Sequence, residues 1–383
     1  MSTEQAVQGT CDSRFAAVRD VFAANLAAGR EVGASFAATV EGRPVIDLWG
    51  GHADAAQTRP WQRDTIVNVF STTKAMTALC AHRLVDLGRL DLDAPVACYW
   101  PEFAAGGKEE IPVRMLLSHT AGLAAVRQPL DVATLLDWER YASAIAEQTP
   151  WWEPGTANGY HALTYGHLVG EVVRRVTGTT LGRFFRDEFA GPLGADFRIG
   201  LDPVEDVRCG EMIGPSAEER AAAGDAPPPP ESLRARVLGN PVLRPEIANT
   251  AAWRRAEIPA ANGHGNARSV ARVLSVLACG GAVDGIRLLD GETIARAIAP
   301  QAYDRDLVLG FKVKWGLGFM LRAPELPLGP NPRTAGHGGW GGSLGFADLD
   351  ARVSWAYVMN RMAPGTAGDT RGFALMTALY SAL

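Results

Sequence analysis

The sequence of 383 residues lacks the features that mark several common classes of protein. No apolar run approaches the length of a membrane span, and the N-terminus has no basic segment followed by an apolar one, as a secretory signal would. The formal net charge of -5 leaves no basic excess, which argues against a nucleic-acid partner. The five cysteines are widely spaced, without a Cys-x-x-Cys pair, so reduced thiols and a cytoplasmic location are expected.

Lysine is also scarce. It occupies four positions, against thirty-three arginines, and one of the four, Lys74, follows Ser71 by three residues. The apolar residues after Lys74 recur at helical spacing, and Gly88 is suited to end a helix, which predicts an amphipathic helix over about 71–87. Residues three apart share a helix face. Ser71 and Lys74 are therefore expected to point the same way from the first turn.

A hydroxyl and an amine so placed are suited to nucleophilic catalysis. A buried lysine can lose its proton and act as a base, whereas an arginine cannot. The start of a helix adds unpaired backbone N–H groups and the positive end of the helix dipole, which stabilise an oxyanion. The alternative is that Ser71 merely begins a surface helix, but the scarcity of lysine argues against a chance pairing with Lys74.

The expected elements place strands at both ends of the chain and helices in the middle. One sheet built from both ends is expected, with residues 1–95 and 265–383 as one α/β (α+β) domain and residues 96–264 as an inserted mainly helical domain, the active site lying between them. The tract 215–231 is expected to be a loop or disordered insert. The expected strands cover 34–40, 44–49, 314–322, 342–348 and 353–359, and the expected helices cover 13–29, 142–147, 163–176, 267–278 and 370–382.

A third catalytic group is expected in the segment 151–162. Pro154-Gly155 and Asn158-Gly159 mark tight loops, which present Tyr160 just before the expected helix 163–176. Its phenol is suited to bridge the serine hydroxyl and the leaving group, and a cationic lysine nearby would favour the phenol's anion. The alternative is a packed tyrosine whose hydroxyl bonds a backbone carbonyl.

Glycine is dense in the segment 336–343, which reads Gly-His-Gly-Gly-Trp-Gly-Gly-Ser. Glycines just before a strand let another backbone or a ligand come close, so this sheet edge is expected to line the site and supply a backbone N–H. A plain glycine-rich turn is the alternative. Gly341 to Gly345 also matches Gly-x-Ser-x-Gly, the nucleophile elbow of α/β-hydrolases. That fold requires a histidine downstream of the serine, and none follows His337, so Ser343 is not expected to be the nucleophile.

Together these motifs resemble the serine β-lactamase and penicillin-binding-protein superfamily, and within it the class-C-like carboxylesterases of family VIII. The resemblance runs from about residue 13 to the C-terminus. It rests on Ser71 to Lys74, on Leu116 to Leu123, on Pro154 to Tyr160 and on His337 to Gly339. It implies a β-lactamase-like antiparallel sheet flanked by helices, with an inserted all-helical domain.

The resemblance also implies roles for individual residues. Ser71 would be the nucleophile, Lys74 the neighbouring base and Tyr160 the third catalytic group. The backbone N–H groups of Ser71 and Trp340 would form the oxyanion hole. His119, in a segment similar to a structural part of the family, would be a helix-start or packing residue rather than a catalyst.

Substrate binding is implied at His337, Gly338 and Gly339, together with Trp340, and here the sequence departs from the β-lactamase pattern. The Lys-Thr-Gly motif of class C β-lactamases is replaced by His337 to Gly339, which removes a cation and a hydroxyl. Their Tyr-x-Asn motif is replaced by Tyr160 to Ala162, which removes an amide. Both losses favour neutral esters over anionic β-lactams as substrates.

The predicted function is hydrolysis of short-chain carboxylic esters through an acyl-enzyme on Ser71, without metal or cofactor. Three alternatives stay open: a β-lactamase or D,D-peptidase, an acyltransferase of the same superfamily, and a non-enzymatic relative that binds peptides. Substrate preference is expected to depend on loops around 124–150 and 215–262. Six aromatic residues are candidates for an apolar acyl pocket, with Trp340 the strongest because the others are more typical of a core: Tyr99, Trp100, Trp151, Trp152, Trp253 and Trp340.

Overall fold

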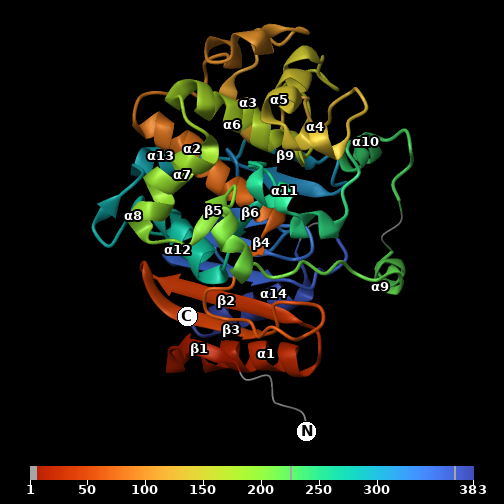
Figure 1. The fold of residues 1–383 in the computed structure, drawn as a ribbon. Coiled ribbons are helices and arrows are strands. Elements are labelled where there is room, and N and C mark those ends of the chain that lie inside the picture. The colour runs from red at the N-terminus through yellow and green to blue at the C-terminus, as the bar shows by residue number, and fades with distance from the viewer. Residues whose placement is uncertain (1–6, 225–226, 366–367) are drawn as a thin grey trace.

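A nine-stranded antiparallel sheet runs through the protein, as a computed structural model shows (Figure 1). The structure describes residues 7–224, 227–365 and 368–383. The strands of this sheet come from residues 8–51 and 302–359, and no described residue between 96 and 264 takes part. From one edge to the other the strands are β1 (Gln8–Cys11), β3 (Arg43–Gly51), β2 (Gly33–Val40), β14 (Val353–Met359), β13 (Leu344–Asp348), β12 (Thr334–Gly338), β11 (Met320–Leu321), β10 (Lys312–Trp315) and β9 (Ala302–Arg305).

The centre of the sheet follows the sequence pattern. β2 and β14 are apolar over most of their length and buried on both faces, and they pair with each other in a register that sets Val353 opposite Val40. The expected strands near 34–40, 44–49 and 353–359 are therefore present. The predicted α/β (α+β) fold, with an antiparallel sheet flanked by helices, is confirmed.

Two strand expectations need correction. The expected strand 314–322 is broken between Trp315 and Met320, because Gly318 turns the chain with a φ of +91°. The residues before the expected strand 342–348 form a strand of their own, β12, which pairs with β13. The sequence Thr-Ala-Gly-His-Gly of β12 holds few of the residues that favour strands, so its pattern gave no strand signal.

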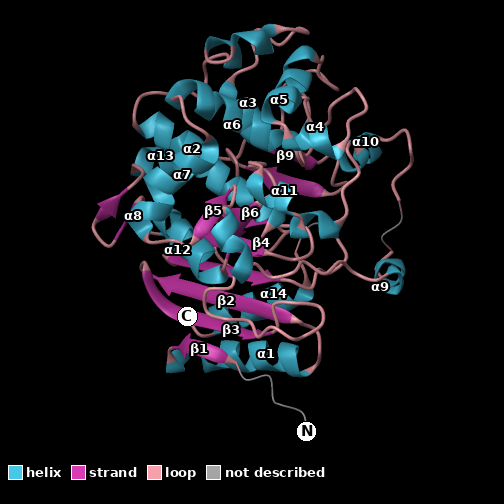
Figure 2. Cartoon of the chain, in the orientation of Figure 1, coloured by secondary structure: helices cyan, strands magenta, loops and turns pink. Residues whose placement is uncertain are grey.

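Helices cover both faces of the sheet (Figure 2). On one face, α12 (Ala267–Ala278) packs against β2, β13 and β14. On the other face, α1 (Ala16–Ala27) and α14 (Thr370–Ser381) pack against each other, and Gly372 of α14 lies against Leu344 and Tyr357. These helices lie within the expected ranges 13–29, 267–278 and 370–382.

The helix that carries Lys74 lies at the centre of the protein. The α-helix α2 spans Thr73–Asp86 and is preceded by a 3₁₀ turn over Phe70–Thr72. Its side chains are buried on nearly every side because α6 (Thr164–Thr177), α7 (Leu181–Phe185) and β12 pack around it. The expected position is right, but the expected amphipathic character is wrong, since the helix has little contact with water.

The middle of the chain is mainly helical, as expected, although a small sheet ties it to the segment before Ser71. In that sheet β6 (Gly263–Gly265) pairs with β4 (Val67–Asn68) and β5 (Phe197–Ile199). The tract 215–231 contains a short helix, α9 (Ala217–Ala222). Residues 225 and 226 of this tract lie outside the described part. The remaining elements are α3 (Val113–Leu117), α4 (Val132–Leu136), α5 (Trp138–Glu147), α8 (Gly191–Leu193), β7 (Ala282–Val283), β8 (Ile286–Arg287), α9 (Ala217–Ala222), α10 (Leu233–Gly239), α11 (Ala251–Arg255) and α13 (Gly291–Ala297).

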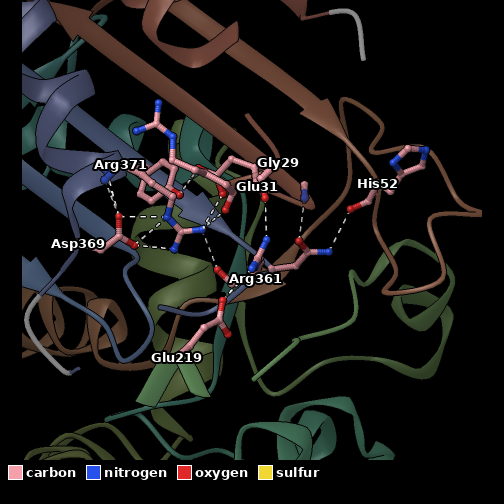
Figure 3. A network of polar contacts seen from close by, with 12 residues as sticks. Gly29, Glu31, His52, Glu219, Arg361, Asp369 and Arg371 are labelled. Atoms are coloured by element: carbon pink, nitrogen blue, oxygen red, sulfur yellow. Dashed lines mark hydrogen bonds and ion pairs between the residues drawn. The ribbon is translucent and has the colours of Figure 1, made fainter. Parts of the chain in front are cut away.

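A buried ion-pair network fixes the start of α14 (Figure 3). Arg371 donates to Glu31 at 2.8 Å and to Asp369 at 2.6 Å, and the Tyr357 hydroxyl donates to Glu31. Burial raises the pKa of Glu31 to about 7, against the opposing effect of Arg371. A Cβ on Gly342 would lie 2.1 Å from Asp369 Oδ2, so the network packs directly against the glycine-rich turn after Trp340.

Within the described residues, the helices are all too short or too polar to cross a membrane.

Candidate active site

The chain reaches Ser71 through a strained turn. After β4, Phe70 adopts a φ of +44°, in the left-handed region that bulky residues rarely occupy. The Thr73 hydroxyl donates to the Phe70 carbonyl at 2.5 Å, and the Gly263 N–H donates to Thr73 Oγ1 at 2.9 Å. Strain of this kind gathers at functional sites, where the surrounding structure must hold it. The turn sets Ser71 at the wall of a cavity.

Lys74 is fully buried, with 0% of its surface exposed. Its Nζ lies 3.0 Å from Ser71 Oγ, and it donates to the carbonyl oxygens of Ala162 at 2.8 Å and Ala260 at 2.9 Å. Among the residues that the structure describes, no carboxylate forms an ion pair or hydrogen bond with this amine. Burial therefore lowers the pKa of Lys74 well below its ordinary value, which favours the uncharged amine over the ammonium.

An uncharged Lys74 fits the groups around it. A neutral amine offers two N–H donors and one lone pair, and the carbonyls of Ala162 and Ala260 accept the two N–H groups. The Tyr160 hydroxyl donates to Ser71 Oγ at 2.7 Å, and Lys74 Nζ lies within hydrogen-bond distance of the same oxygen. The lone pair of Lys74 is thus placed to receive the proton of Ser71.

Tyr160 lies in the expected loop before α6, but its electrostatic state differs from the expectation. Burial raises the pKa of the Tyr160 hydroxyl above its usual range, against the opposing hydrogen bond to Ser71. The effect expected from a cationic lysine does not outweigh burial here, so the neutral phenol is favoured over its anion. Lys74 Nζ lies 4.7 Å from the centre of the Tyr160 ring. Tyr160 is therefore a neutral hydrogen-bond donor.

Asp306 holds the Tyr160 loop in place, and sequence reasoning missed it. Its Oδ1 accepts the backbone N–H of Tyr160 at 2.9 Å, and its Oδ2 accepts Asn158 Nδ2 at 3.1 Å and Trp315 Nε1 at 3.2 Å. The Trp315 ring lies nearly parallel to the Tyr160 ring, with centres 5.8 Å apart. A lone acid and a lone tryptophan, each so far along the chain from Tyr160, form no motif in the sequence.

The glycine-rich segment comes close to the backbone before Ser71, as its composition predicted. A Cβ on Gly339 would lie 2.1 Å from Ser343 Oγ and 2.3 Å from the Val69 carbonyl oxygen. Ser343 donates to that carbonyl at 2.7 Å and lies 3.0 Å from Thr72 Oγ1. With 1% of its surface exposed, Ser343 braces two backbones together. Its burial agrees with its exclusion as the nucleophile.

The two residues expected to supply the oxyanion-hole N–H groups both belong to the cavity wall. Ser71 and Trp340 both line this cavity, and the Trp340 ring makes an edge contact with Phe70 at 5.1 Å. Gly339 and Gly342 use their N–H groups within the turn, whereas the N–H groups of Ser71 and Trp340 donate to no other described residue. Both are therefore available to a ligand oxygen.

The other predicted substrate-binding residues lie behind Trp340. His337 is 1% exposed, and its Nδ1 donates to the Gly338 carbonyl at 2.6 Å. Burial, with Lys74 nearby, lowers the pKa of His337 to about 3, so the ring is neutral. His337, Gly338 and Gly339 are not among the described residues that line the cavity. Their contact with a substrate stays a prediction.

Two further histidines, His119 and His161, lie next to Tyr160. The His161 N–H donates to His119 Nδ1 at 3.1 Å, and His161 Nε2 accepts the Leu123 N–H at 3.0 Å. Burial lowers the pKa of His161 to about 4, and burial also lowers the pKa of His119. The His119 ring packs 5.2 Å from the Tyr160 ring. These contacts agree with the interpretation of His119 as a packing residue.

A cavity of about 230 Å³ opens in front of Ser71 and Tyr160. One wall comes from α10 and the chain after it, inside the range 215–262 that the sequence linked to substrate preference. Within the described part of the chain, Trp340 is the one aromatic candidate among the lining residues, while Trp100 and Trp253 are buried in the core. The remaining lining residues are Phe70, Ala162, Leu163, Arg234, Val237, Leu238, Pro241, Leu243, Ala261 and Gly365.

Comparisons with known proteins agree with this arrangement. The family model described as Beta-lactamase matches residues 18–378. The curated protein "Esterase/beta-lactamase LipL" of Mycobacterium tuberculosis is 37% identical over 389 residues, which cover 96% of this chain and 86% of that protein. The aligned region therefore covers nearly the whole chain and not only the catalytic motifs.

Two solved structures are similar over the whole fold. A family VIII carboxylesterase has a TM-score of 0.92 at 46% identity, with 99% of this chain and 100% of that chain covered. A penicillin-binding protein homologue from Caulobacter crescentus has a TM-score of 0.91 at 42% identity, with the same coverage. The resemblance inferred from the motifs is confirmed, and the chain belongs to the beta-lactamase family.

Proposed function

We propose that the chain is a serine carboxylesterase that hydrolyses short-chain carboxylic esters through an acyl-enzyme on Ser71. The observation that carries this proposal is the fully buried Lys74 amine 3.0 Å from Ser71 Oγ, with Ser71 at the wall of a largely apolar cavity. The names of the similar proteins, an esterase/beta-lactamase and a family VIII carboxylesterase, support the same chemistry.

Acylation follows from the positions of three side chains. Lys74 takes the proton of Ser71 as Ser71 Oγ attacks the ester carbonyl carbon. The negative charge on the carbonyl oxygen is stabilised by the backbone N–H groups of Ser71 and Trp340, and losing one such donor typically costs about 3 kcal/mol. Tyr160, a neutral donor, passes its proton to the departing alkoxide and recovers the proton held on Lys74.

Deacylation repeats these steps with water in place of Ser71. Lys74 takes a proton from the water as its oxygen attacks the acyl carbon, and the oxyanion returns to the same two N–H groups. Collapse of the intermediate breaks the bond to Ser71 Oγ, which regains a proton through Tyr160. The products are a carboxylic acid and an alcohol, and no other reactant is consumed.

Hydrolysis of β-lactams is a second candidate, because the name of LipL includes it. In this chain Ala162 stands where class C enzymes have the Asn of Tyr-x-Asn, and its carbonyl is already bonded to Lys74. His337 stands where those enzymes have the Lys of Lys-Thr-Gly and is neutral. We expect these replacements to leave a cephalosporin nearly unhydrolysed.

The domain division belongs to the same proposal. Residues 1–95 and 265–383 would form one domain and 96–264 an inserted one, with Tyr160 from the insert facing Ser71. This division is supported by the origin of the large sheet in residues 8–51 and 302–359, while residues 1–6 lie outside the described part. A cytoplasmic location is supported by five free cysteines.

The test compares the unaltered protein with Ser71→Ala on p-nitrophenyl acetate, p-nitrophenyl butyrate and a chromogenic cephalosporin. The proposal predicts rapid hydrolysis of both esters, little of the cephalosporin, and no activity for Ser71→Ala. Rapid cephalosporin turnover would favour the second candidate. Ester hydrolysis that survives in Ser71→Ala would place the nucleophile elsewhere.

A labelling experiment identifies the nucleophile without relying on rates. A fluorophosphonate should attach to the peptide that contains Ser71, and Ser71→Ala should lose the label. Ser343→Ala is the matched control because it removes the serine of the Gly-x-Ser-x-Gly match. Its folded fraction should still take up the label, and loss of the label only in Ser343→Ala would reverse the assignment.

A further inference from the structure

Arg234 introduces a cation into the wall of a cavity that is otherwise almost without charge. Beyond Ser71 and Tyr160, the other described lining residues are apolar side chains and Gly365, and no carboxylate is among them. Lys74 is fully buried and is not among the described lining residues. Among the described residues that line the cavity, Arg234 is the one with a charged side chain.

This guanidinium keeps most of its hydrogen-bonding capacity. Arg234 Nη1 donates to the carbonyl oxygens of Val308 and Leu309, both at 3.3 Å, and in the described structure it has no ion pair with a carboxylate. Two residues along α10, Arg236 has the opposite surroundings, because it pairs with Glu231 at 3.0 Å. An arginine has five N–H donors in a planar fork, so Arg234 can still bind a carboxylate with two parallel hydrogen bonds.

Arg234 is tied to the catalytic residues by one short segment. Asp306 Oδ1 accepts the N–H groups of Val308 and Leu309, each at 2.9 Å, and it also accepts the N–H of Tyr160. The carbonyls of Val308 and Leu309 in turn hold Arg234. The Asp306 carboxylate therefore positions both Tyr160 and the segment whose carbonyls hold the Arg234 guanidinium. This links the position of the guanidinium to that of the catalytic residues.

We propose that Arg234 binds a carboxylate of the substrate, so that the preferred esters are half-esters or other esters that carry a free carboxylate. This inference rests on the proposed esterase function. The apolar wall around Arg234 strengthens the pairing, since a charge pair gains more where water is excluded. Leu238, another lining residue that is 40% exposed, marks the open side of the cavity, where an uncharged remainder of the ester can extend.

The carboxylate can sit on either side of the ester bond, and matched substrates separate the two cases. Mono-p-nitrophenyl glutarate and p-nitrophenyl pentanoate have the same acyl length and differ by the carboxylate on the acyl part. For the alcohol part, 4-acetoxybenzoate is compared with phenyl acetate. In the unaltered protein, one of the two pairs should show a preference of about tenfold or more in kcat/KM for the charged ester, and this preference should weaken at high salt.

Arg234→Gln tests the residue, with Arg236→Gln on the same helix as the control. Arg234→Gln should bring the preference close to one, mainly by raising KM for the charged ester, and Arg236→Gln should leave the preference intact. If Arg234 only supports the fold, both esters of a pair lose activity equally and the ratio stays constant, which overturns the proposal.

The unaltered protein provides a test that does not depend on the stability of a variant. Absence of any preference for the charged ester in both pairs overturns the proposal while leaving the esterase function in place. Absence of hydrolysis of every ester overturns the esterase function, and the proposal falls with it. A preference that survives 0.5 M salt unchanged also contradicts an ion pair at Arg234.

Discussion

Two buried basic side chains in this protein have opposite surroundings. Lys74 is 0% exposed, and among the described residues its amine forms hydrogen bonds only with carbonyl and hydroxyl oxygens. The side chain of Arg371 is 7% exposed and lies between Glu31 and Asp369 (Figure 3). Burial lowers the pKa of Lys74, and nothing opposes it. Burial alone would lower the pKa of Arg371 as well, but Tyr357 and the two carboxylates outweigh it and raise that pKa. Burial therefore favours loss of the Lys74 proton, whereas Arg371 keeps its charge because it is paired with carboxylates.

The presence or absence of a carboxylate partner decides whether the basic side chain serves catalysis or stabilises the fold. A lysine without a carboxylate partner becomes a base, since its free lone pair can accept the proton of Ser71. An arginine cannot be deprotonated, so Arg371 with two carboxylates serves only to hold α14 against the sheet. The two sites meet at Gly342, which lies between the Asp369 carboxylate and the turn that carries Trp340.

Replacing Lys74 with a basic residue that cannot lose its proton should have the largest effect on activity. Lys74→Arg introduces a permanent cation and supplies no base, so kcat/KM for p-nitrophenyl butyrate should fall by about 10²- to 10⁴-fold. Lys312→Arg, on the exposed part of β10, is the control and should keep its rate. A Lys74→Arg variant with more than a tenth of the original rate would show that no uncharged base is needed.

Breaking the paired site should affect stability rather than chemistry. Arg371→Met leaves Glu31 and Asp369 buried without their partner, so the free energy of unfolding in urea should fall by about 3–5 kcal/mol. Arg287→Met removes an exposed contact of 3.9 Å to Asp290 and should have little effect. If Arg371→Met is as stable as the unaltered protein, the network does not stabilise the fold.

Distorting the junction between the two sites should have an intermediate effect on both. Gly342 has a φ of +123°, and an added Cβ would collide with Asp369. Gly342→Ala should therefore lower the free energy of unfolding by about 1–3 kcal/mol and shift Trp340, with a loss of about tenfold or more in kcat. Gly285→Ala, at φ +77° with no atom near its Cβ, is the matched control and should keep its kcat.

A further effect is a pH dependence of stability. In the unfolded chain Lys74 titrates near 10.4, above its pKa in the folded protein, so between the two values the unfolded state binds more protons and stability rises with pH. Lys74→Met removes this cost of burial. Its advantage in free energy of unfolding over the unaltered protein should be largest near pH 7 and shrink toward pH 10. A constant difference across this range would mean that the two pKa values are equal.

What could be predicted from the sequence was local. Ser71 and Lys74 stand one helical turn apart, and Tyr160 lies in a loop marked by Pro-Gly and Asn-Gly, so spacing and turn chemistry were enough to identify the three residues that the fold brings together. The central strands have clear apolar patterns, and the family resemblance and the antiparallel sheet are confirmed. The catalytic roles of Ser71, Lys74 and Tyr160 stay proposals.

The missed features depend on contacts between distant parts of the chain. Asp306 reaches Tyr160 across 146 positions, and Arg234 reaches the cavity from a helix that follows a proline-rich tract. Neither residue belongs to a motif. β12 was missed because its glycines hide the strand pattern. The raised pKa of the Tyr160 hydroxyl depends on burial, which only the fold reveals.

The charge state of Lys74 can be measured directly because the chain holds four lysines. Protein labelled with ¹³C at lysine Cε gives few resonances, and Lys74→Met assigns the one that it removes. Burial also lowers the pKa of Lys108, to about 8, which makes this assignment necessary. The account predicts that the Lys74 resonance has the chemical shift of an uncharged amine at pH 8. A Lys74 resonance that titrates near 10.4 would contradict it.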